Sequence, residues 1–337
     1  MEVIAPAAPL TIDEPSQVPA ARRAASRLAE TLGFDAVGAG NVALVVTEIG
    51  TNILKHGGGG QILLITVRQG DVDGIEIVGL DRGQGIADVG RSLRDGYSTA
   101  GSPGTGLGAI RRLSSAFDIY AAPGQGTAVL ARLWPRRPAP QPHRLVVGAA
   151  AAAHAGEDVS GDAWAMEQTA TRTVLLLVDG LGHGVVAAEA ARQAVRVFRA
   201  NAGDTPRGIV QALHEGLRST RGAAAAVTEI DPDRGLVKFS GVGNICAAIF
   251  TPGGRRHLVS HNGTAGLAAR KIDEFSYPWS PETVLVEHTD GLATHWDVAR
   301  YPSLLGRSPS LIAGVLYRDW TRGRDDVTVI AAREMPA

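Results

Sequence analysis

Cysteine is almost absent from this chain of 337 residues, in which Cys246 is the only one. A single cysteine excludes an internal disulfide and a cysteine-rich zinc site. It also argues against a phosphatase with a thiolate nucleophile, because residues 247–250 supply no anion-binding loop with an arginine. The surrounding NICAAIF segment predicts a buried strand, so we expect a structural role for Cys246.

Long apolar runs and an excess of one charge are lacking too. No segment approaches the roughly 20 continuous apolar residues of a membrane helix, and the N-terminal residues lack the basic and apolar regions of a signal peptide. The 33 basic residues balance 34 acidic ones, for a formal net charge of −1, which argues against a surface built for nucleic acid or anionic membrane. We expect a cytoplasmic protein whose partner is another protein, and its oligomeric state stays open.

Length and proline content predict two domains. A chain of this length exceeds the size at which one hydrophobic core usually stops growing. The segment WPRRPAPQPH, residues 134–143, contains four prolines, which interrupt helices and central strands. We predict an N-terminal domain at residues 1–134, a linker at 135–143 and a C-terminal domain at 144–337.

Hydrophobic periodicity in the first domain predicts helices that alternate with antiparallel strands. Apolar residues recur at helical spacing before glycine stops, and short apolar runs flank turn sequences. The predicted elements are helices at 16–32, 37–56 and 107–116, and strands at 61–68, 74–78, 117–120 and 127–133. Together they predict a two-layer α/β sandwich.

One polar stripe marks the second predicted helix. Glu48, Asn52 and Lys55 are spaced at i, i+4 and i+7, so they lie on one side of that helix. A carboxylate and an amide one turn apart can hold a water and a hydrated Mg²⁺, with the lysine facing a phosphate. Taken alone, such a stripe is more often a solvated helix face.

Two glycine-rich segments follow it along the chain. In DRGQGI, Asp81 follows an apolar strand and can accept a hydrogen bond from an exocyclic amine, while Gly83 and Gly85 let backbone approach a flat ring. In GSPGTGLGAI, residues 101–110, glycines expose backbone N–H groups at a helix N-terminus, which suits phosphate. Each segment alone is weak evidence, and the order of all three features is the stronger signal.

These features resemble the GHKL ATPase superfamily, and more closely the anti-sigma-factor and stressosome switch kinases of the RsbT type. The resemblance covers nearly all of residues 10–134 and implies a Bergerat ATP-binding fold. It implies that Asn52 ligates Mg²⁺, that Asp81 reads adenine, and that Glu48 orients or deprotonates an attacking serine or threonine hydroxyl. The residues implied to wrap the phosphates of ATP are Gly104, Thr105, Gly106, Leu107 and Gly108. The matching motifs are TEIGTNILKHG, LDRGQGI and DGYSTAGSPGTGLGAIRRL.

Two other nucleotide-binding folds are excluded. No GxxxxGK[ST] segment is present for a P-loop. A dinucleotide-binding Rossmann fold fails because GTGLGA follows a loop, without a βαβ unit or an acidic residue after a following strand. No histidine marks a sensor-kinase phosphoacceptor domain, so we expect direct transfer of phosphate to a partner protein.

Aspartates recur beside the predicted strands of the second domain. Asp179 and Asp290 each follow an apolar run and precede a glycine, Asp162 follows the first strand, and Asp325 precedes the strand VTVIAA. Any single Asp-Gly pair is more often a turn than a ligand. Carboxylates from several strand ends, however, make an oxygen-rich cage for hard divalent cations. Without such ions their repulsion and desolvation would raise their pKa values.

These aspartates resemble the metal motifs of the SpoIIE and PP2C class of protein phosphatases, most nearly the small RsbX type. The matching segments are SGDAW, VDGLGHG, TDGL and RDDVTV, over about residues 144–333. The resemblance implies a β-sandwich flanked by helices, with two Mn²⁺ or Mg²⁺ ions and a bridging water that attacks phosphorus. The implied metal ligands are Asp162, Asp179, the carbonyl of Gly180, Asp290 and Asp325.

Some residues near these motifs have open roles. His183 either protonates the leaving serine or threonine oxygen or shapes the turn into the next helix. Asp326 is expected to support the ligands rather than to bind metal, and Glu157 is an unassigned acid nearby. The larger PP2C enzymes carry an arginine for the substrate phosphate, and this sequence has no clear equivalent.

Three functions follow from these patterns. The first is a bifunctional switch enzyme, which phosphorylates and dephosphorylates a STAS-type protein in a sigma-factor regulatory pathway. The second keeps only the phosphatase as an enzyme and makes the ATP domain a nucleotide-dependent binding module. The third is an interaction protein with two degenerate sites. All the motif residues of both sites are present, which favours the first.

Overall fold

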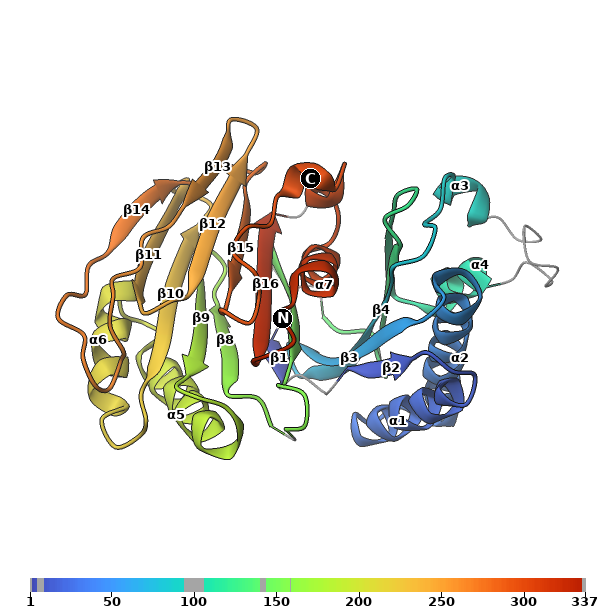
Figure 1. The fold of residues 1–337 in the computed structure, drawn as a ribbon, viewed down its shortest axis with the longest axis horizontal. Coiled ribbons are helices and arrows are strands. Elements are labelled where there is room, and N and C mark those ends of the chain that lie inside the picture. Colours follow the sequence, from blue (N-terminus) through green and yellow to red (C-terminus); the bar gives the residue numbers. More distant parts are fainter. Residues whose placement is uncertain (1, 5–8, 94–105, 140–143, 158, 335–337) are drawn as a thin grey trace. The chain divides into compact units, whose positions relative to one another are not determined.

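The computed structural model describes residues 2–4, 9–93, 106–139, 144–157 and 159–334. It divides the chain into two compact units. The N-terminal unit contains residues 3–141 together with 297–318, and the C-terminal unit contains residues 1–2, 142–296 and 319–337. Figure 1 labels the helices and strands of both units.

Two long helices form the helical layer of the N-terminal unit. Helix α1 spans Gln17–Thr31 and α2 spans Ala36–Asn52, and a π-helical turn, Ile53–Gly57, continues α2. Asp35 caps α2 because its side chain accepts a hydrogen bond of 2.7 Å from the N–H of Gly38. By length and composition alone, Ala36–Gly57 is long and apolar enough to cross a membrane. The buried side chains on α2 belong to the core of this unit, and a core helix can be equally long and apolar.

The other layer is one sheet with the strand order β1-β3-β4-β6-β5, and β2 pairs with β3. Its strands are β1 (Glu2–Ile4), β2 (Leu10–Ile12), β3 (Gly60–Gln69), β4 (Val72–Asp81), β5 (Ala116–Ala121) and β6 (Thr127–Leu133). The short helix α3, Val89–Ser92, follows β4, and α4, Gly106–Leu113, precedes β5. The helix predicted at 107–116 ends early because β5 already begins at Ala116 and Ala116 pairs with Arg132.

A segment distant in sequence completes the N-terminal unit. Residues 297–318 include most of helix α7, Pro309–Trp320, whose side chains from Pro309 to Arg318 are all buried. The Tyr317 hydroxyl donates a hydrogen bond of 3.1 Å to Gln61 on β3. A Cβ atom at Gly314 would lie 3.3 Å from the side chains of Leu80 and Val78 on β4. The helix therefore packs closely on this sheet.

The C-terminal unit is a sandwich of two five-stranded sheets. The first, called the β9 sheet, has the order β14-β11-β10-β9-β8, and the second, called the β16 sheet, has the order β13-β12-β15-β16-β7. The strands of the β9 sheet are β8 (Asp162–Gln168), β9 (Thr173–Gly180), β10 (Ala223–Asp231), β11 (Leu236–Val242) and β14 (Phe275–Pro278). Those of the β16 sheet are β7 (Leu145–Ala152), β12 (Cys246–Thr251), β13 (Gly254–His257), β15 (Val284–His288) and β16 (Val327–Glu334).

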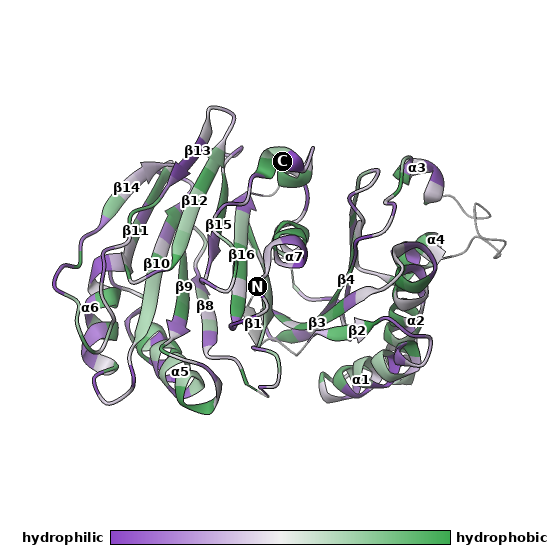
Figure 2. Ribbon diagram, in the orientation of Figure 1, coloured by the Kyte–Doolittle hydropathy of each residue, from purple (hydrophilic) through white to green (hydrophobic). Residues whose placement is uncertain are grey.

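Apolar strands and two amphipathic helices hold this sandwich together. Helices α5, Gly184–Asn201, and α6, Pro206–Gly216, cover one face of the β9 sheet. Figure 2 shows hydrophobic residues along β9 and β12, whereas α6 also carries hydrophilic residues. Between the sheets, Thr228 on β10 donates a hydrogen bond to the buried carboxyl group of Glu287 on β15. The predicted fold class, an α/β sandwich and a β-sandwich flanked by helices, is confirmed.

Candidate functional site

Strand register brings the motif aspartates of the C-terminal unit to one region. Asp162 begins β8 and pairs with Asp179 near the end of β9. Asp290 lies two residues after the end of β15, and Asp325 lies two residues before β16, the antiparallel neighbour of β15. Each carboxylate is therefore fixed by a strand terminus, as the sequence predicted.

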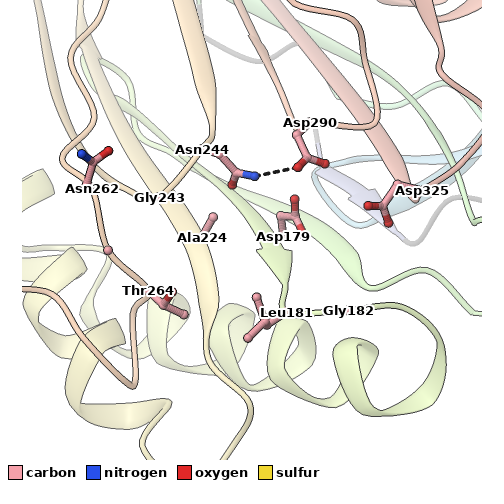
Figure 3. Close-up of a pocket in the computed structure, with 11 residues that line it drawn as sticks. Asp179, Leu181, Gly182, Ala224, Gly243, Asn244, Asn262, Thr264, Asp290 and Asp325 are labelled. Carbon is pink, nitrogen blue, oxygen red and sulfur yellow. Dashed lines mark hydrogen bonds between the residues drawn. The ribbon is translucent and has the colours of Figure 1, made fainter.

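Three of these carboxylates line one cavity of about 400 Å³. Asp179, Asp290 and Asp325 lie at one end of this carboxylate cavity, and Asn262 and Thr264 lie at the other (Figure 3). The remaining lining residues are Leu181, Gly182, Ala224, Gly243, Asn244 and Gly263. The side chain of Asn244 donates a hydrogen bond of 2.7 Å to Asp290, which fixes the orientation of that carboxylate.

Asp162 is buried beside the cavity. Its Oδ2 accepts a hydrogen bond of 2.7 Å from the hydroxyl of Thr289, and its Oδ1 is buried without a hydrogen-bond partner among the described residues. Burial, and then the negative charge of Asp179, raise the pKa of Asp162 well above its ordinary value. A buried carboxylate oxygen without a donor fits a cation as its missing partner.

The aspartates in the cavity repel one another. Burial raises the pKa of Asp179 to about 7, and the charges of Asp290 and Asp325 add to the shift. Burial and Asp325 also raise the pKa of Asp290, against the opposing charge of Arg322. Within residues 2–4, 9–93, 106–139, 144–157 and 159–334, no three His, Cys, Asp or Glu side chains already converge tightly enough to hold an ion. Cations would relieve the repulsion that keeps these groups protonated or apart.

The two aspartates of the last motif differ in what they bind. Both oxygens of Asp326 accept backbone hydrogen bonds of 2.8 Å, one from His154 and one from Gly161. Asp325 instead lines the cavity. This division supports the expectation that Asp325 is the ligand and Asp326 the supporting residue. The N–H of Gly180 donates to Gly161 at 3.0 Å, so the same loop also holds the end of β9.

His183 has two neighbours that the sequence did not assign to it. Its Nδ1 lies 2.7 Å from a carboxylate oxygen of Glu157, and its ring stacks on His154 with the centroids 5.1 Å apart. A hydrogen bond from Nδ1 to the carboxylate leaves Nε2 to face a leaving group. His183 is also the N-cap position of α5, although its side chain makes no capping bond. Both roles of His183 therefore stay predictions.

In the N-terminal unit, Glu48 and Asn52 converge on the start of α4. A Cβ atom at Gly106 would lie 3.3 Å from Oε2 of Glu48 and 3.6 Å from the Asn52 amide. Asn52 ends the regular part of α2, where the π-helical turn begins. Such turns inside helices are frequent at functional sites. The carboxylate and amide predicted to act together thus lie together.

The π-helical turn changes the placement of Lys55. It lies within Ile53–Gly57 and is exposed, and the α-helical register that aligned it with Glu48 ends before it. Gly104 and Thr105 lie outside the described residues. Gly106, Leu107 and Gly108 form the first turn of α4. The phosphate roles of these six residues, and the Mg²⁺ role of Asn52, stay predictions.

Asp81 is buried at the end of β4. Its Oδ1 accepts backbone hydrogen bonds from Gly83 at 2.8 Å and Thr127 at 3.1 Å. Burial raises its pKa, while these two bonds oppose the shift. Gly83 and Gly85 have a structural reason to be glycine, because an added Cβ would lie 2.2 Å from the His56 carbonyl and 2.0 Å from the Ala122 carbonyl respectively. Their approach to adenine stays a prediction.

Sequence reasoning missed several residues of these sites. Asn244, Asn262 and Thr264 line the cavity from loops with no catalytic motif, and Thr289 acts through a hydrogen bond that only the fold reveals. A weak signal existed for Asn244, since it follows an apolar strand in the glycine-containing segment VGN. Cys246 begins β12 and is half-buried, and burial raises the pKa of its thiol, consistent with the predicted structural role.

Known proteins resemble both parts of the chain. Residues 12–133 match the family model described as histidine kinase-like ATPase domain, and residues 169–334 match Stage II sporulation protein E (SpoIIE). Serine/threonine-protein kinase RsbT of Bacillus subtilis (strain 168) is 34% identical over 117 residues, which are 35% of this chain and 88% of that protein. Phosphoserine phosphatase RsbX of the same strain is 23% identical over 176 residues, 52% of this chain and 87% of that protein.

Two solved structures are each similar in fold to 57% of the chain. One is a chain of the structure described as "The bacterial stressosome: a modular system that has been adapted to control secondary messenger signaling", with a TM-score of 0.54, 28% identity and 100% of that chain covered. Another is RsbX in complex with magnesium, with a TM-score of 0.52, 21% identity and 96% of that chain covered. At that identity, RsbX supports the fold of the phosphatase domain.

Proposed function

The chain belongs to the histidine kinase-like ATPase family through its RsbT-like N-terminal domain, which it joins to a SpoIIE/PP2C-type phosphatase domain, and from this premise we propose a switch enzyme that adds and removes phosphate on a STAS-type protein. The phosphatase half hydrolyses phosphoserine or phosphothreonine. The kinase half transfers phosphate from ATP to a serine or threonine hydroxyl of the same or a related protein.

Divalent ions fit the carboxylate cavity. Asp179, Asp290 and Asp325 line it, and the unpartnered buried oxygen of Asp162 needs a positive partner. We assign these four aspartates, with the Gly180 carbonyl, as the residues that would hold two Mn²⁺ or Mg²⁺ ions. Ions bound there would lower the pKa of a water and neutralise charge on the phosphoryl oxygens.

The protein's own groups orient this reaction. Asn244 fixes the carboxylate of Asp290, and Thr289 fixes that of Asp162. His183 donates a proton to the serine or threonine oxygen as the P–O bond breaks, with Glu157 holding its Nδ1. Water supplies the oxygen that remains on phosphate, so no phosphorylated enzyme side chain is required.

The kinase half depends on Glu48 and Asn52 at the start of α4. We assign Asn52 to Mg²⁺ with the phosphates of ATP, Asp81 to adenine, and Glu48 to the attacking hydroxyl. In this role Glu48 accepts the hydroxyl proton while the oxygen forms a bond to the γ-phosphorus, and ADP leaves. Lys55 and Gly104–Gly108 would face the phosphates.

A protein substrate from a sigma-factor regulatory pathway fits both halves. RsbT is named a protein kinase and RsbX a phosphoserine phosphatase, and a chain of a stressosome structure is among the similar solved structures. We therefore propose a STAS-domain substrate and action in the cytoplasm. The balanced charge of the chain agrees with a protein partner rather than nucleic acid.

The observation that carries the phosphatase assignment is the carboxylate cavity with Asp162 beside it. The direct test incubates the whole chain with ATP, Mg²⁺ and STAS proteins encoded beside its gene, followed by mass spectrometry of serine and threonine phosphorylation. The phosphorylated product is then purified and returned to the chain with Mn²⁺ and no nucleotide. Gain of phosphate in the first step and loss in the second support the proposal, and an unchanged mass in both steps contradicts it.

A further inference from the structure

Exposed apolar side chains gather beside the carboxylate cavity. Large hydrophobic side chains are at least 48% exposed at Leu181, Val185, Val186 and Leu267, which we call the apolar rim. Leu181 lines the cavity itself, and Val185 and Val186 lie in the first turn of α5, directly after the turn that carries His183. The other exposed large hydrophobic side chains in the described residues are Val37, Leu44 and Val259.

Close packing of three loops places Leu267 on the same side as Leu181. The N–H of Leu181 donates a hydrogen bond of 3.0 Å to the Gly222 carbonyl. A Cβ atom at Gly222 would lie 3.2 Å from Cγ of Leu267. Ala223 and Ala265 exchange backbone hydrogen bonds of 3.0 and 2.8 Å, which fix the third loop against the second. The rim is thus part of a fixed surface rather than a set of scattered side chains.

A positively charged side chain, Arg221, lies beside the cavity and the apolar rim. A Cβ atom at Gly182, which lines the cavity, would lie 3.3 Å from Nη1 of Arg221. Arg221 is exposed. Among the residues that the structure describes, no carboxylate forms an ion pair with it. A guanidinium group beside a phosphatase cavity is suited to the oxygens of a phosphate monoester.

We propose that the apolar rim and Arg221 bind the phosphorylated segment of the substrate protein, with Arg221 on the phosphate and the rim on an apolar side chain next to the phosphorylated residue. This inference rests on the proposed phosphatase function and adds a sequence preference to it. Isolated exposed apolar residues need no partner, but a group of them beside a cationic side chain at a cavity mouth complements a phosphorylated apolar segment.

The test compares phosphoserine peptides that differ only in the flanking residue, Leu or Asp, with para-nitrophenyl phosphate as the reference substrate. We expect the parent chain with Mn²⁺ to prefer the Leu peptide by about ten-fold or more in kcat/KM. Leu267→Ser should reduce that preference to within about two-fold, whereas Leu44→Ser, at a side chain 51% exposed in the N-terminal unit, should keep it. Arg221→Gln should lower kcat/KM for both peptides, unlike the nearby control Arg218→Gln.

A binding measurement separates this inference from the phosphatase assignment. Fluorescence anisotropy of the labelled Leu peptide with the parent chain in EDTA involves no turnover, and we expect weaker binding in Leu267→Ser and in Arg221→Gln. If no substrate is hydrolysed but this binding pattern holds, the phosphatase assignment fails alone. Equal kcat/KM for both peptides, or a Leu preference that survives Leu267→Ser, overturns the docking inference. Self-association lost in Leu267→Ser would assign the rim to a second copy of the chain and overturn it as well.

Discussion

The hydroxyl of Thr289 donates a hydrogen bond of 2.7 Å to Oδ2 of Asp162. The same hydroxyl oxygen accepts a hydrogen bond of 2.9 Å from the N–H of Thr328 on β16. Thr289, which follows β15, therefore fixes the carboxylate of Asp162, the first residue of β8 in the other sheet. In the proposed metal site, this link would hold the unpartnered Oδ1 of Asp162 in position for a cation.

Thr289→Val should weaken metal binding, because the carboxylate of Asp162 loses the donor that orients it. Loss of a hydrogen bond that orients a metal ligand costs roughly 10- to 100-fold in affinity, so Mn²⁺ titration calorimetry should show a decrease of that size. Thr289→Ser keeps the hydroxyl and should stay close to the parent. Equal Mn²⁺ affinity in Thr289→Val and Thr289→Ser would show that this hydrogen bond does not contribute to metal binding.

Glu48→Ala should stop phosphate transfer from ATP to the partner protein and leave hydrolysis of para-nitrophenyl phosphate intact. Glu48 lies beside Asn52 at the start of α4, in the unit that does not contain the carboxylate cavity. Mass spectrometry of the partner measures the transfer, and Glu30→Gln on α1 is an acidic control. Transfer at the parent rate in Glu48→Ala would contradict the role given to Glu48, whereas a parent chain that binds ATP without any transfer would favour a nucleotide-dependent binding module.

Glu287 should make stability depend on pH. Burial raises its pKa from 4.5 to about 7, so the folded state holds a proton that the unfolded state releases between these values. The stabilising contribution is complete below pH 4.5 and is lost as pH rises through about 7. Its full size is about 3 kcal/mol.

The matched variant for this effect is Glu287→Gln, which cannot ionise. Urea unfolding of both proteins at pH 5 and pH 8 should show the parent losing more stability than the variant at the higher pH. Because other titrating groups are common to both, the difference isolates Glu287. A parallel change in both proteins would mean that the carboxyl group titrates normally in the core.

Gly314→Leu should destabilise the N-terminal unit. A Cβ atom alone would already lie 3.3 Å from Leu80 and Val78, so a larger side chain must displace α7 from β4. Overpacking of this kind costs about 1–3 kcal/mol, measured as a lower midpoint in thermal unfolding. Gly40→Leu, at a helical glycine with no atom within 4 Å of its Cβ position, is the control and should not lower the midpoint. A similar fall in both variants would contradict close packing of α7.

Local patterns in the sequence predicted most elements because those elements depend on their own residues. The strand Thr127–Leu133 agrees with the prediction to the residue. The π-helical turn after Asn52 was not predicted, since a single turn of five residues is too short for its wider spacing to show in the apolar pattern. Inclusion of residues 297–318 in the N-terminal unit could not be predicted either, because it depends on contacts between distant segments such as Tyr317 and Gln61.

The same distinction applies to the sites. Asp179 and Asp290 were singled out because each follows an apolar run in a recognisable motif. Asn244 and Thr289 carry no motif, and their roles come from hydrogen bonds to those aspartates and to Asp162. Glu157 was noticed as an acid, but only the fold places it 2.7 Å from His183.

Mn²⁺-dependent hydrolysis of para-nitrophenyl phosphate by the whole chain tests the central claim most directly. The account predicts activity that EDTA abolishes and that Asp179→Asn lowers more than about 100-fold. Asp233→Asn, at an acid that pairs with Arg144 on the surface, should keep the parent rate. Hydrolysis that survives in Asp179→Asn at the parent rate, or a parent chain that is inert with Mn²⁺ and Mg²⁺, would contradict it.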